Sequence, residues 1–571
     1  MSKQIVRFRN IFTELGFVVS EQVIPSDIPC FISVQLRLFV KNRPNFSIDT
    51  LGNGTNREGA LASAYGEMVE RIQNDAFFLN THYLQLAKEK DREGELYERI
   101  RRNGLAMEVK AGSIASSFQD LNEMSRKILM QCFGLSSWDK LLCQLEHLYP
   151  QKHLELSEFS VNGRNEDRLL LPLGIMQNHS SVNGMAAGVT REQAILRGVF
   201  EVLEKYIIWR LYENSNFMTS SSIVMDDSME LCAAIDCMES YGYAVRFYDC
   251  SYDFSIPIVG ALVIDRTGKR QAFTVAADVN EAKARLRALS RIFKVEGESK
   301  FLDYDYFGEI LPEKKKHEYF KNITRGNGRW PFVFSSFEQS LAHKSSIKID
   351  SEALIEELNR KGLEVLVRDV NSVGVPSVYV YIPGMSEIVY RMDKSDYFEH
   401  QIAMQRNMEL LEKQDWNGRC FQHLLEASNN IYSFDPRYLI PYHNNQEMAK
   451  KDLSLLLASM AAFANDLPQA EMLLQNYSVE AESDKEEEAF ALQFLAGRVH
   501  ENNSGKDWYK QRILDQEVSS KYLESPSNYF NQKDFLFPFC PHCDRCPIEK
   551  DCFYLDVMSL YCQYQLNKTV N

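Results

Sequence analysis

The sequence predicts an α/β protein with a core of mixed sheets and acidic helices, followed by an all-helical C-terminal region. Stretches rich in β-branched and aromatic residues alternate with helical ones from residue 229 to 289, as expected where strands and helices build one core. Beyond about residue 400, apolar side chains recur at helical spacing over 453–464. We therefore expect an N-terminal part of the core at 1–50, the core at 51–400, a helical module at 401–530 and a cysteine-rich tail at 531–571.

The core elements can be assigned in order along the chain. Residues 5–15 have a helical pattern, and residues 31–38 alternate like a half-buried strand. Later helices are expected at 81–105, within 113–148, and at 230–241, 280–289 and 351–360. Later strands are expected at 169–174, 244–248, 256–264, 271–276, 363–368 and 378–382. Residues 178–184 should form a loop, in which His179 is structural and from which Asn183 reaches a ligand.

Composition limits the classes of function. The chain has 571 residues, of which 45% are hydrophobic and 25% charged, as in soluble globular proteins. A net charge of -15 argues against nucleic acid and anionic membranes as principal partners. No apolar run reaches the roughly 18 residues of a membrane span, and residues 1–7 do not lead into a signal sequence. The expected location is the cytoplasm.

One motif occurs twice, at a constant offset of 134 residues (188 minus 54). Each copy has a glycine turn followed by a helix without proline. The matched pairs are Gly54/Gly188, Arg57/Arg191, Glu58/Glu192, Ala60/Ala194, Glu67/Glu201 and Glu70/Glu204. The offset indicates an internal repeat whose two helices carry corresponding acids.

The repeated acids lie beside apolar residues on each predicted helix. Carboxylates near a core repel one another and lose hydration, so a positive group should lie between them. A Mg2+ ion that also binds phosphate oxygens would satisfy them and would neutralise a nucleotide. The predicted ligands are Glu67, Glu70, Glu201 and Glu204. Alternatively, these acids are solvated and pair with Arg57, Arg71, Arg197 and Lys205.

These motifs resemble a known family. The pattern Ser63-x-x-x-Glu67-x-x-Glu70-Arg71, with the turn at 183–190 before Glu201-x-x-Glu204, is similar to the paired signatures of YcaO proteins, over roughly residues 50–400. The resemblance implies a fold that binds ATP and Mg2+ through acidic helices. In active members it implies phosphorylation of a peptide amide oxygen, leading to azolines or thioamides, and other members are connected with methylthiolation of a ribosomal protein. The implied cofactor-binding residues are Ser63, Glu67, Glu70, Arg71, Asn183, Gln193, Glu201, Glu204, Lys205, Arg287 and Arg291.

The sequence departs from the family pattern at three of these positions. Gln193 and Arg291 stand where the family usually carries acids, and Lys205 stands for an arginine. As a fixed cation, Arg291 could contact phosphate directly. The same predicted helix face carries Arg287, Arg291, Lys294 and Glu298, and it either binds phosphate or is a solvated basic edge.

The C-terminal tail carries a second chemical signal. Four thiols occur within thirteen residues, at Cys540, Cys543, Cys546 and Cys552. In a reducing compartment such spacing favours metal binding over disulfides. Pro547 after the third cysteine favours a 4Fe-4S cluster, while a Zn2+ site, with or without His542, and unliganded thiols remain alternatives. A metal here would mainly hold the C-terminus in place.

Two functional hypotheses follow. In the first, the chain uses ATP and Mg2+ to activate a peptide or protein backbone amide, or serves a protein-modifying enzyme such as a ribosomal-protein methylthiotransferase. In-line phosphoryl transfer needs positioning and charge neutralisation more than a protein nucleophile. In the second, the chain is a degenerate scaffold that recruits partners without hydrolysing ATP. The expected partners are a peptide or protein substrate, a modifying enzyme and a second copy of the chain in a homodimer.

Overall fold

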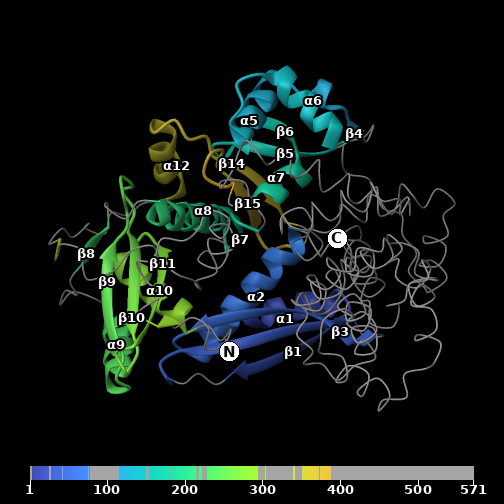
Figure 1. The fold of residues 1–571 in the computed structure, drawn as a ribbon. Helices are drawn as coiled ribbons and strands as arrows, with labels where there is room; N and C mark the ends of the chain where they lie inside the picture. Colours follow the sequence, from blue (N-terminus) through green and yellow to red (C-terminus); the bar gives the residue numbers. More distant parts are fainter. Residues whose placement is uncertain are drawn as a thin grey trace, which may run out of the picture.

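The computed structural model describes residues 3–24, 28–40, 43–74, 76, 115–148, 154–180, 182–213, 218–221, 228–293, 302–303, 339–340, 350–371 and 373–387. These residues form three sheets with their covering helices, and one long helix lies between two of the sheets (Figure 1). The expected helix at 81–105, the helical module at 401–530 and the tail at 531–571 lie outside the described residues. Within the described ranges, no helix is both long and apolar enough to cross a membrane.

The first layer is an antiparallel sheet in the order β1-β2-β3, which packs against two helices. Its core forms because alternate strand residues such as Val34, Leu36 and Leu38 face buried side chains of the helices, including Phe12 and Tyr65. The elements are α1 (Lys3–Glu14), β1 (Phe17–Ile24), β2 (Ile32–Val40), β3 (Arg43–Gly54) and α2 (Arg57–Gln73). The predicted helix at 5–15 and strand at 31–38 are confirmed.

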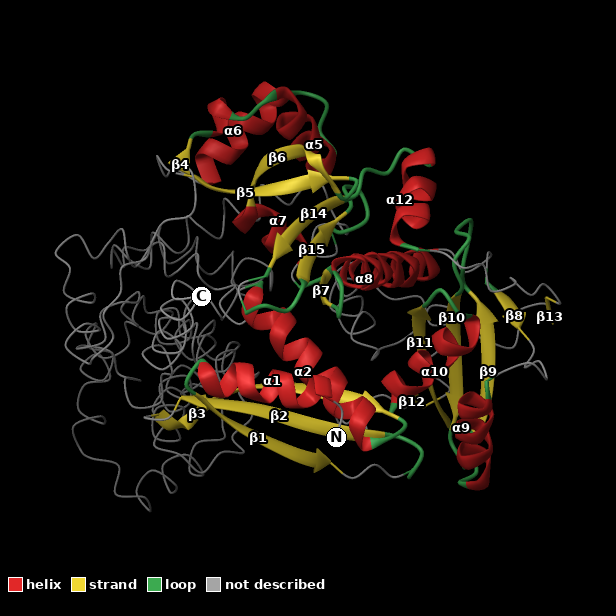
Figure 2. Ribbon diagram, turned by 180° about the vertical axis from the view of Figure 1, so that it is seen from behind, coloured by secondary structure: helices red, strands yellow, loops and turns green. Residues whose placement is uncertain are grey.

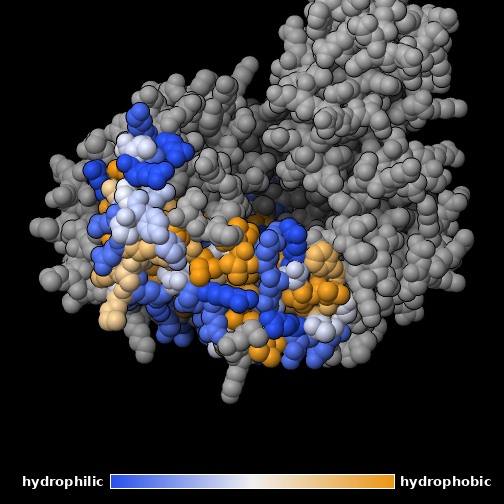
Figure 3. Space-filling model, turned by 90° about the horizontal axis from the view of Figure 1, so that it is seen from below, coloured by the Kyte–Doolittle hydropathy of each residue, from blue (hydrophilic) through white to orange (hydrophobic). Residues whose placement is uncertain are grey.

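Seen from below, the described surface shows hydrophobic and hydrophilic groups interleaved (Figure 3). The exposed apolar side chains of the first layer include Val18 and Val23 on β1, an edge strand of the three-stranded sheet.

The second sheet has the order β4-β5-β14-β15-β7, with β6 paired to β5. Its elements are β4 (Ala115–Ser116), β5 (Leu154–Val161), β6 (Arg164–Pro172), β7 (Met185–Ala187), β14 (Leu366–Val370) and β15 (Ser377–Tyr381), with the helices α5 (Glu123–Phe133), α6 (Trp138–Leu148) and α7 (Leu173–Ser180). The loop expected at 178–184 is wrong in its first part, because α7 continues to Ser180 and places His179 in a helix. This part of the chain is helical because Leu173, Ile175 and Met176 bury themselves against the sheet.

The third sheet has the order β12-β11-β10-β9-β8-β13. Its elements are β8 (Thr219–Ser221), β9 (Ala244–Asp249), β10 (Ile258–Ile264), β11 (Arg270–Ala277), β12 (Leu302–Asp303) and β13 (Gln339–Ser340), covered by α9 (Met229–Ser240) and α10 (Glu281–Ile292). The turn between β10 and β11 is held by Asp265, which accepts hydrogen bonds from Thr267 and Arg270. The predicted strands and helices of 230–289 are confirmed within a few residues.

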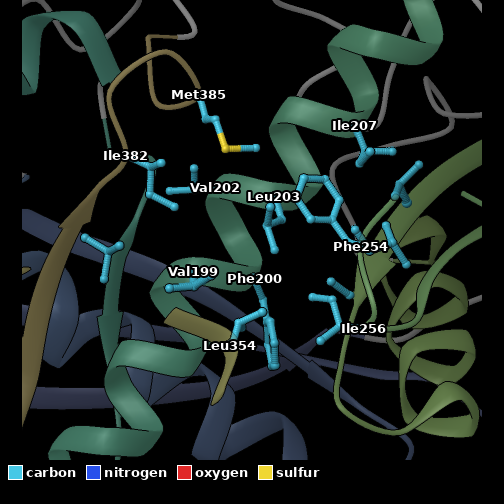
Figure 4. Packing of buried hydrophobic residues seen from close by; sticks show 14 of the residues in the cluster. Val199, Phe200, Val202, Leu203, Ile207, Phe254, Ile256, Leu354, Ile382 and Met385 are labelled. Carbon is cyan, nitrogen blue, oxygen red and sulfur yellow. The ribbon is translucent and has the colours of Figure 1, made fainter. Parts of the chain in front are cut away.

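The long helix is α8 (Arg191–Glu213), and it lies between the second and third sheets (Figure 2). Its apolar residues pack on both sides, with Val202 near Ile382 and Met385, and with Phe200 near Ile256 (Figure 4). Leu354 of α12 (Ser351–Arg360) joins the same core. Because this core buries the apolar side chains of α8, the helix cannot rotate, and its polar stripe has a fixed orientation. That stripe carries the acids of the second motif.

Candidate functional site

The two motif helices begin with the same local geometry. At Gly54, a Cβ atom would lie 2.7 Å from the backbone nitrogen of Ala60, and at Gly188 it would lie 2.6 Å from that of Ala194. A side chain is therefore excluded at both glycines because the strand end and the helix start approach too closely. The backbone nitrogens of Ala60 and Ala194 donate to carbonyl oxygens four residues earlier, at 3.0 and 3.1 Å. The repeat predicted from the sequence thus has a structural counterpart.

A third copy of this unit, β11 with α10, becomes visible only in the structure. Asn280 caps α10 by accepting a hydrogen bond from the Lys283 nitrogen at 3.0 Å, as Asn56 caps α2 through Gly59 at 2.9 Å. The hydroxyl of Thr274 donates to the carbonyl oxygen of Ala288, and the pair Thr50 and Ala64 does the same in the first unit, both at 2.9 Å. Both correspondences have the same offset of 224 residues (280 minus 56).

Equivalent positions in the three units supply the candidate site. The positions that correspond to Glu67 in α2 are Glu201 in α8 and Arg291 in α10, at offsets of 134 and 224. The positions that correspond to Ser63 are Arg197 and Arg287. Arg197 and Arg287 also make the same contact, donating to the carbonyl oxygen ten residues earlier, Ala187 at 3.2 Å and Ala277 at 2.7 Å. The three helices therefore present one set of positions with different charges.

The acids of α2 share one arginine. Arg71 lies 3.6 Å from Glu67, measured from Nη2 to Oε1, and 3.5 Å from Glu70, measured from Nε to Oε1. Burial raises the pKa of the Glu70 carboxyl; Arg71 opposes this rise, while the nearby charge of Glu201 adds to it. Burial also raises the pKa of Glu201, against the attraction of Arg71 and Lys205. The charges of Glu70 and Glu201 thus interact, and Arg71 acts on both, as the alternative interpretation of pairing with arginines expects for α2.

Glu204 has a different environment. Its side chain is only 1% exposed, and Oε2 accepts a hydrogen bond from Arg291 Nη2 at 2.7 Å. Oε1 accepts one from the backbone nitrogen of Ala277 at 2.7 Å and lies 3.5 Å from Arg287 Nη2. Although burial alone would raise the pKa of Glu204, the arginines and this backbone donor lower it overall. Glu204 is therefore an ionised carboxylate neutralised by α10.

The cations around these acids form the other half of the site. Burial lowers the pKa of Lys205 to about 8, although Glu201 acts in the opposite direction. Burial and repulsion from Arg287 lower the pKa of Arg197. Arg287 also lies 3.3 Å from Asp278, an acid that was not among the predicted site residues. Asp278 lies between β11 and α10, and only an alignment of the third unit with the first two would have indicated it from the sequence.

The remaining residues named from the sequence are Gln193, Asn183, Ser63 and His179, and three of them make contacts that stabilise the fold. Gln193 accepts a hydrogen bond from the backbone nitrogen of Val189 at 2.7 Å, which holds the turn before α8. Asn183 is buried and donates to the carbonyl oxygen of Ser386 at 3.4 Å. Ser63 is exposed. His179 is fully buried beside Phe133, and burial lowers its pKa to about 3, so it stays neutral near pH 7.

Within the described residues, no group of three or more His, Cys, Asp or Glu side chains is arranged to hold a metal ion. The four predicted ligands Glu67, Glu70, Glu201 and Glu204 are therefore not grouped as a metal site with three or more acids. A Mg2+ ion can instead be held by one or two protein carboxylates, with water and phosphate oxygens completing its shell. Glu70 and Glu201 fit that smaller requirement, because they lie on two different helices and the charge of Glu201 raises the pKa of Glu70. The metal site predicted at Cys540, Cys543, Cys546 and Cys552 lies outside the described residues and stays a prediction.

Comparison with known proteins supports the resemblance. The family model described as YcaO cyclodehydratase, ATP- and Mg2+-binding, matches residues 51–386. The ribosomal protein S12 methylthiotransferase accessory factor YcaO of Escherichia coli is 22% identical over 422 residues, which are 68% of this chain and 65% of that protein. An uncharacterized protein of Haemophilus influenzae is 22% identical over 441 residues, covering 75% of this chain and 72% of its own length. The chain thus spans just under two thirds of the Escherichia coli relative.

Solved structures of the same kind give weaker matches. A heterocyclase in complex with substrate and cofactor has a TM-score of 0.43 at 15% identity, covering 67% of this chain and 52% of that one. YcaO from Methanopyrus kandleri, bound with AMPPCP and Mg2+, has a TM-score of 0.39 at 17% identity, covering 68% and 90%. The family assignment rests on the match over 51–386, which is more than half of the sequence. This protein belongs to the YcaO family.

Proposed function

We propose that this protein binds ATP with Mg2+ between α2, α8 and α10, and that it uses the nucleotide to activate a backbone amide of a peptide or protein, or to assist a protein-modifying enzyme. The observation that carries the proposal is the burial of Glu70 and Glu201 on two different helices, where burial raises both pKa values and the charge of Glu201 raises that of Glu70 further. Such a pair is stabilised when a divalent cation enters. The name of the Escherichia coli relative supports the accessory role as one form of this function.

The charges allow a division of work. Glu70 and Glu201 would hold Mg2+, and Glu67, whose side chain is 28% exposed and lies 3.6 Å from Arg71, would contact a water of the ion. Arg287 would be the cation of α10 that faces phosphate. Arg287 and Arg291 are equally exposed, at 36% and 37%, but Arg291 is hydrogen-bonded to Glu204 at 2.7 Å whereas Arg287 lies 3.5 Å from it. Arg71 and Lys205 balance the remaining negative charge.

When bound, Mg2+-ATP supplies the phosphoryl group that makes an amide oxygen a leaving group. The chain's own residues would contribute position and electrostatic stabilisation, which in-line phosphoryl transfer needs more than a protein nucleophile. The charged residues are carried by helices that pack against the sheets, so their positions are fixed by the core. The substrate, the modifying enzyme and a homodimer stay predictions.

The test is calorimetric titration of the full chain with Mg2+-ATP. Glu201→Ala and Glu70→Gln should each weaken binding by about tenfold or more, since each removes one carboxylate from the ion, worth about 1.4 kcal/mol or more. Glu158→Gln is the matched control, because Glu158 is an acid 60% exposed on β5 and paired with Arg168 away from α2 and α8. Equal affinity of the wild type and all three variants for Mg2+-ATP would contradict the proposed site.

The second candidate is a scaffold that binds partners without hydrolysing ATP. It is favoured by the ion pairs of Glu204 with Arg291 and Arg287, which neutralise one of the four predicted acids without any metal. Negligible heats for wild type and Glu201→Ala alike would support the scaffold. Binding of Mg2+-ATP without measurable phosphate release, with or without added peptide, would support a nucleotide-binding scaffold.

A further inference from the structure

Comparison of the three strand-turn-helix units shows which residues of α2 and α8 correspond to Arg291 of α10. In α2 and α8 the equivalent positions are carboxylates, Glu67 and Glu201, whereas α10 presents a guanidinium there. The caps and strand-to-helix contacts described above show that this equivalence is structural, since Asn56 and Asn280 cap their helices alike. The charge at one of three corresponding positions is thus reversed within a single site.

The reversed charge faces the most buried of the acids. Arg291 donates from Nη2 to Glu204 at 2.7 Å and from Nη1 to the carbonyl oxygen of Val275 at 2.8 Å. These bonds anchor its guanidinium to both α8 and β11. Arg287 and the Ala277 nitrogen occupy the other carboxylate oxygen of Glu204. Both oxygens therefore have partners before any ligand is present.

We propose that Arg291 is a resident cation that takes the place of a divalent ion at Glu204, so that Glu204 is a positioning residue for Arg287 and not a metal ligand. The inference rests on the proposed function, because it concerns the same nucleotide site. It leaves Glu70 and Glu201 as the carboxylates that bind Mg2+. It also gives the arginines of α10 two tasks, with Arg291 holding Glu204 at 2.7 Å and Arg287, which lies 3.5 Å from Glu204, facing phosphate.

The physical reason is that a guanidinium and a divalent ion compete for the same oxygens. The planar guanidinium of arginine donates several N–H bonds to a carboxylate, and it stays protonated near neutral pH. A metal that bound Glu204 would have to displace Arg291 and leave a partly buried arginine near other cations, including Lys205. Removing the guanidinium should instead open Glu204 to a metal.

The experiment counts Mn2+ ions bound by the full-length protein, using the electron paramagnetic resonance signal of free Mn2+, with and without ATP. The proteins are wild type, Arg291→Ala, Glu204→Gln and the double variant of these two, together with Glu201→Ala as the test of the proposed function. Arg270→Ala is the matched control, because it also removes an arginine 3.2 Å from a buried carboxylate, Asp265, but in the turn between β10 and β11. Thermal melts establish that each variant is folded.

We expect Arg291→Ala to bind one more ion than wild type, and the double variant to return to the wild-type number. Glu204→Gln and Arg270→Ala should each keep the wild-type number. An unchanged number in folded Arg291→Ala, or the loss of an ion in Glu204→Gln, would overturn the inference. Failure of the proposed function would give a different result: ATP would add no bound ion to wild type, and Glu201→Ala would bind the same number of ions as wild type. In that case the extra ion of Arg291→Ala can still be measured with Mn2+ alone.

Discussion

The side chain of Asn74 joins the end of α2 to β15, donating from Nδ2 to the hydroxyl oxygen of Ser377 at 3.1 Å. Next to it, Gln73 donates to the carbonyl oxygen of Val375 at 2.9 Å, and Gln177 donates to the carbonyl oxygen of Asn74 at 3.1 Å. All three amides are buried. Because Glu70 lies one helical turn before Asn74, these contacts fix its carboxylate relative to α8.

Asn74→Ala should destabilise the protein by about 1–3 kcal/mol, because it removes the hydrogen bonds that Asn74 Nδ2 donates to Ser377 and to the carbonyl oxygens of Glu70 and Val378. Urea unfolding measures the change. The same variant should weaken Mg2+-ATP binding, since the end of α2 loses its anchor. Gln35→Ala is the control, because Gln35 bonds to Asp49 in an exposed pair; a loss of nucleotide binding in both variants would contradict the link between the anchor and the site.

Glu70→Gln should raise the melting temperature at pH 7. Because burial raises the pKa of Glu70 above its usual 4.5, folded protein holds this proton over a pH range in which unfolded protein has lost it. The stability due to Glu70 is therefore complete below about pH 4.5 and is lost as pH rises. The gap between variant and wild type should close toward pH 4.

Added Mg2+ should reverse this order of stability. In wild type the ion can bind the carboxylates of both Glu70 and Glu201, whereas Glu70→Gln leaves it one of the two, so the ion stabilises wild type more. Scanning calorimetry from pH 4 to 8, with and without Mg2+, measures both effects. A wild type more stable than Glu70→Gln at pH 7 without Mg2+ would show that the carboxylate is not strained there.

Lys205 should give the site a pH dependence in the alkaline range. Burial lowers its pKa to about 8, so the site loses a positive charge as pH rises through that value. Affinity for Mg2+-ATP should fall by about tenfold between pH 7 and 9, equivalent to about 1.4 kcal/mol. Lys205→Arg keeps its charge over this range and should flatten the profile. An equal decline in both proteins would assign the effect to another group.

Gly184→Ala should be among the most damaging substitutions in the core. Gly184 has φ +88°, and a Cβ there would lie 2.0 Å from the carbonyl oxygen of Val380. Since β7 and β15 cannot separate without breaking their pairing, we expect a loss of more than about 3 kcal/mol. Gly268→Ala is the matched control, with φ +67° but no atom within 4 Å, and should cost only about 1–2 kcal/mol. Urea unfolding of both variants separates the clash from the backbone strain.

Local pattern predicted much of the core. The helix of the first motif and the strands of 244–276 follow from side-chain periodicity, which depends on residues a few positions apart. The prediction of a loop at 178–184 was wrong in its first part because α7 runs to Ser180, with Ile175 and Met176 buried against the second sheet. That burial depends on contacts between residues far apart in the sequence. The third unit was missed because only a few residues, such as Asn56 and Asn280, are shared with it.

By itself, the sequence determined that two helices carry acids at matching positions and that some cation must balance them. The tertiary structure alone decided which cation meets which acid, because Arg71 comes from the same helix as Glu70 whereas Arg291 reaches Glu204 across 87 residues of chain. Helical spacing is encoded within a few turns of sequence. The pairing of charges from distant segments depends instead on how the second and third sheets pack around α8.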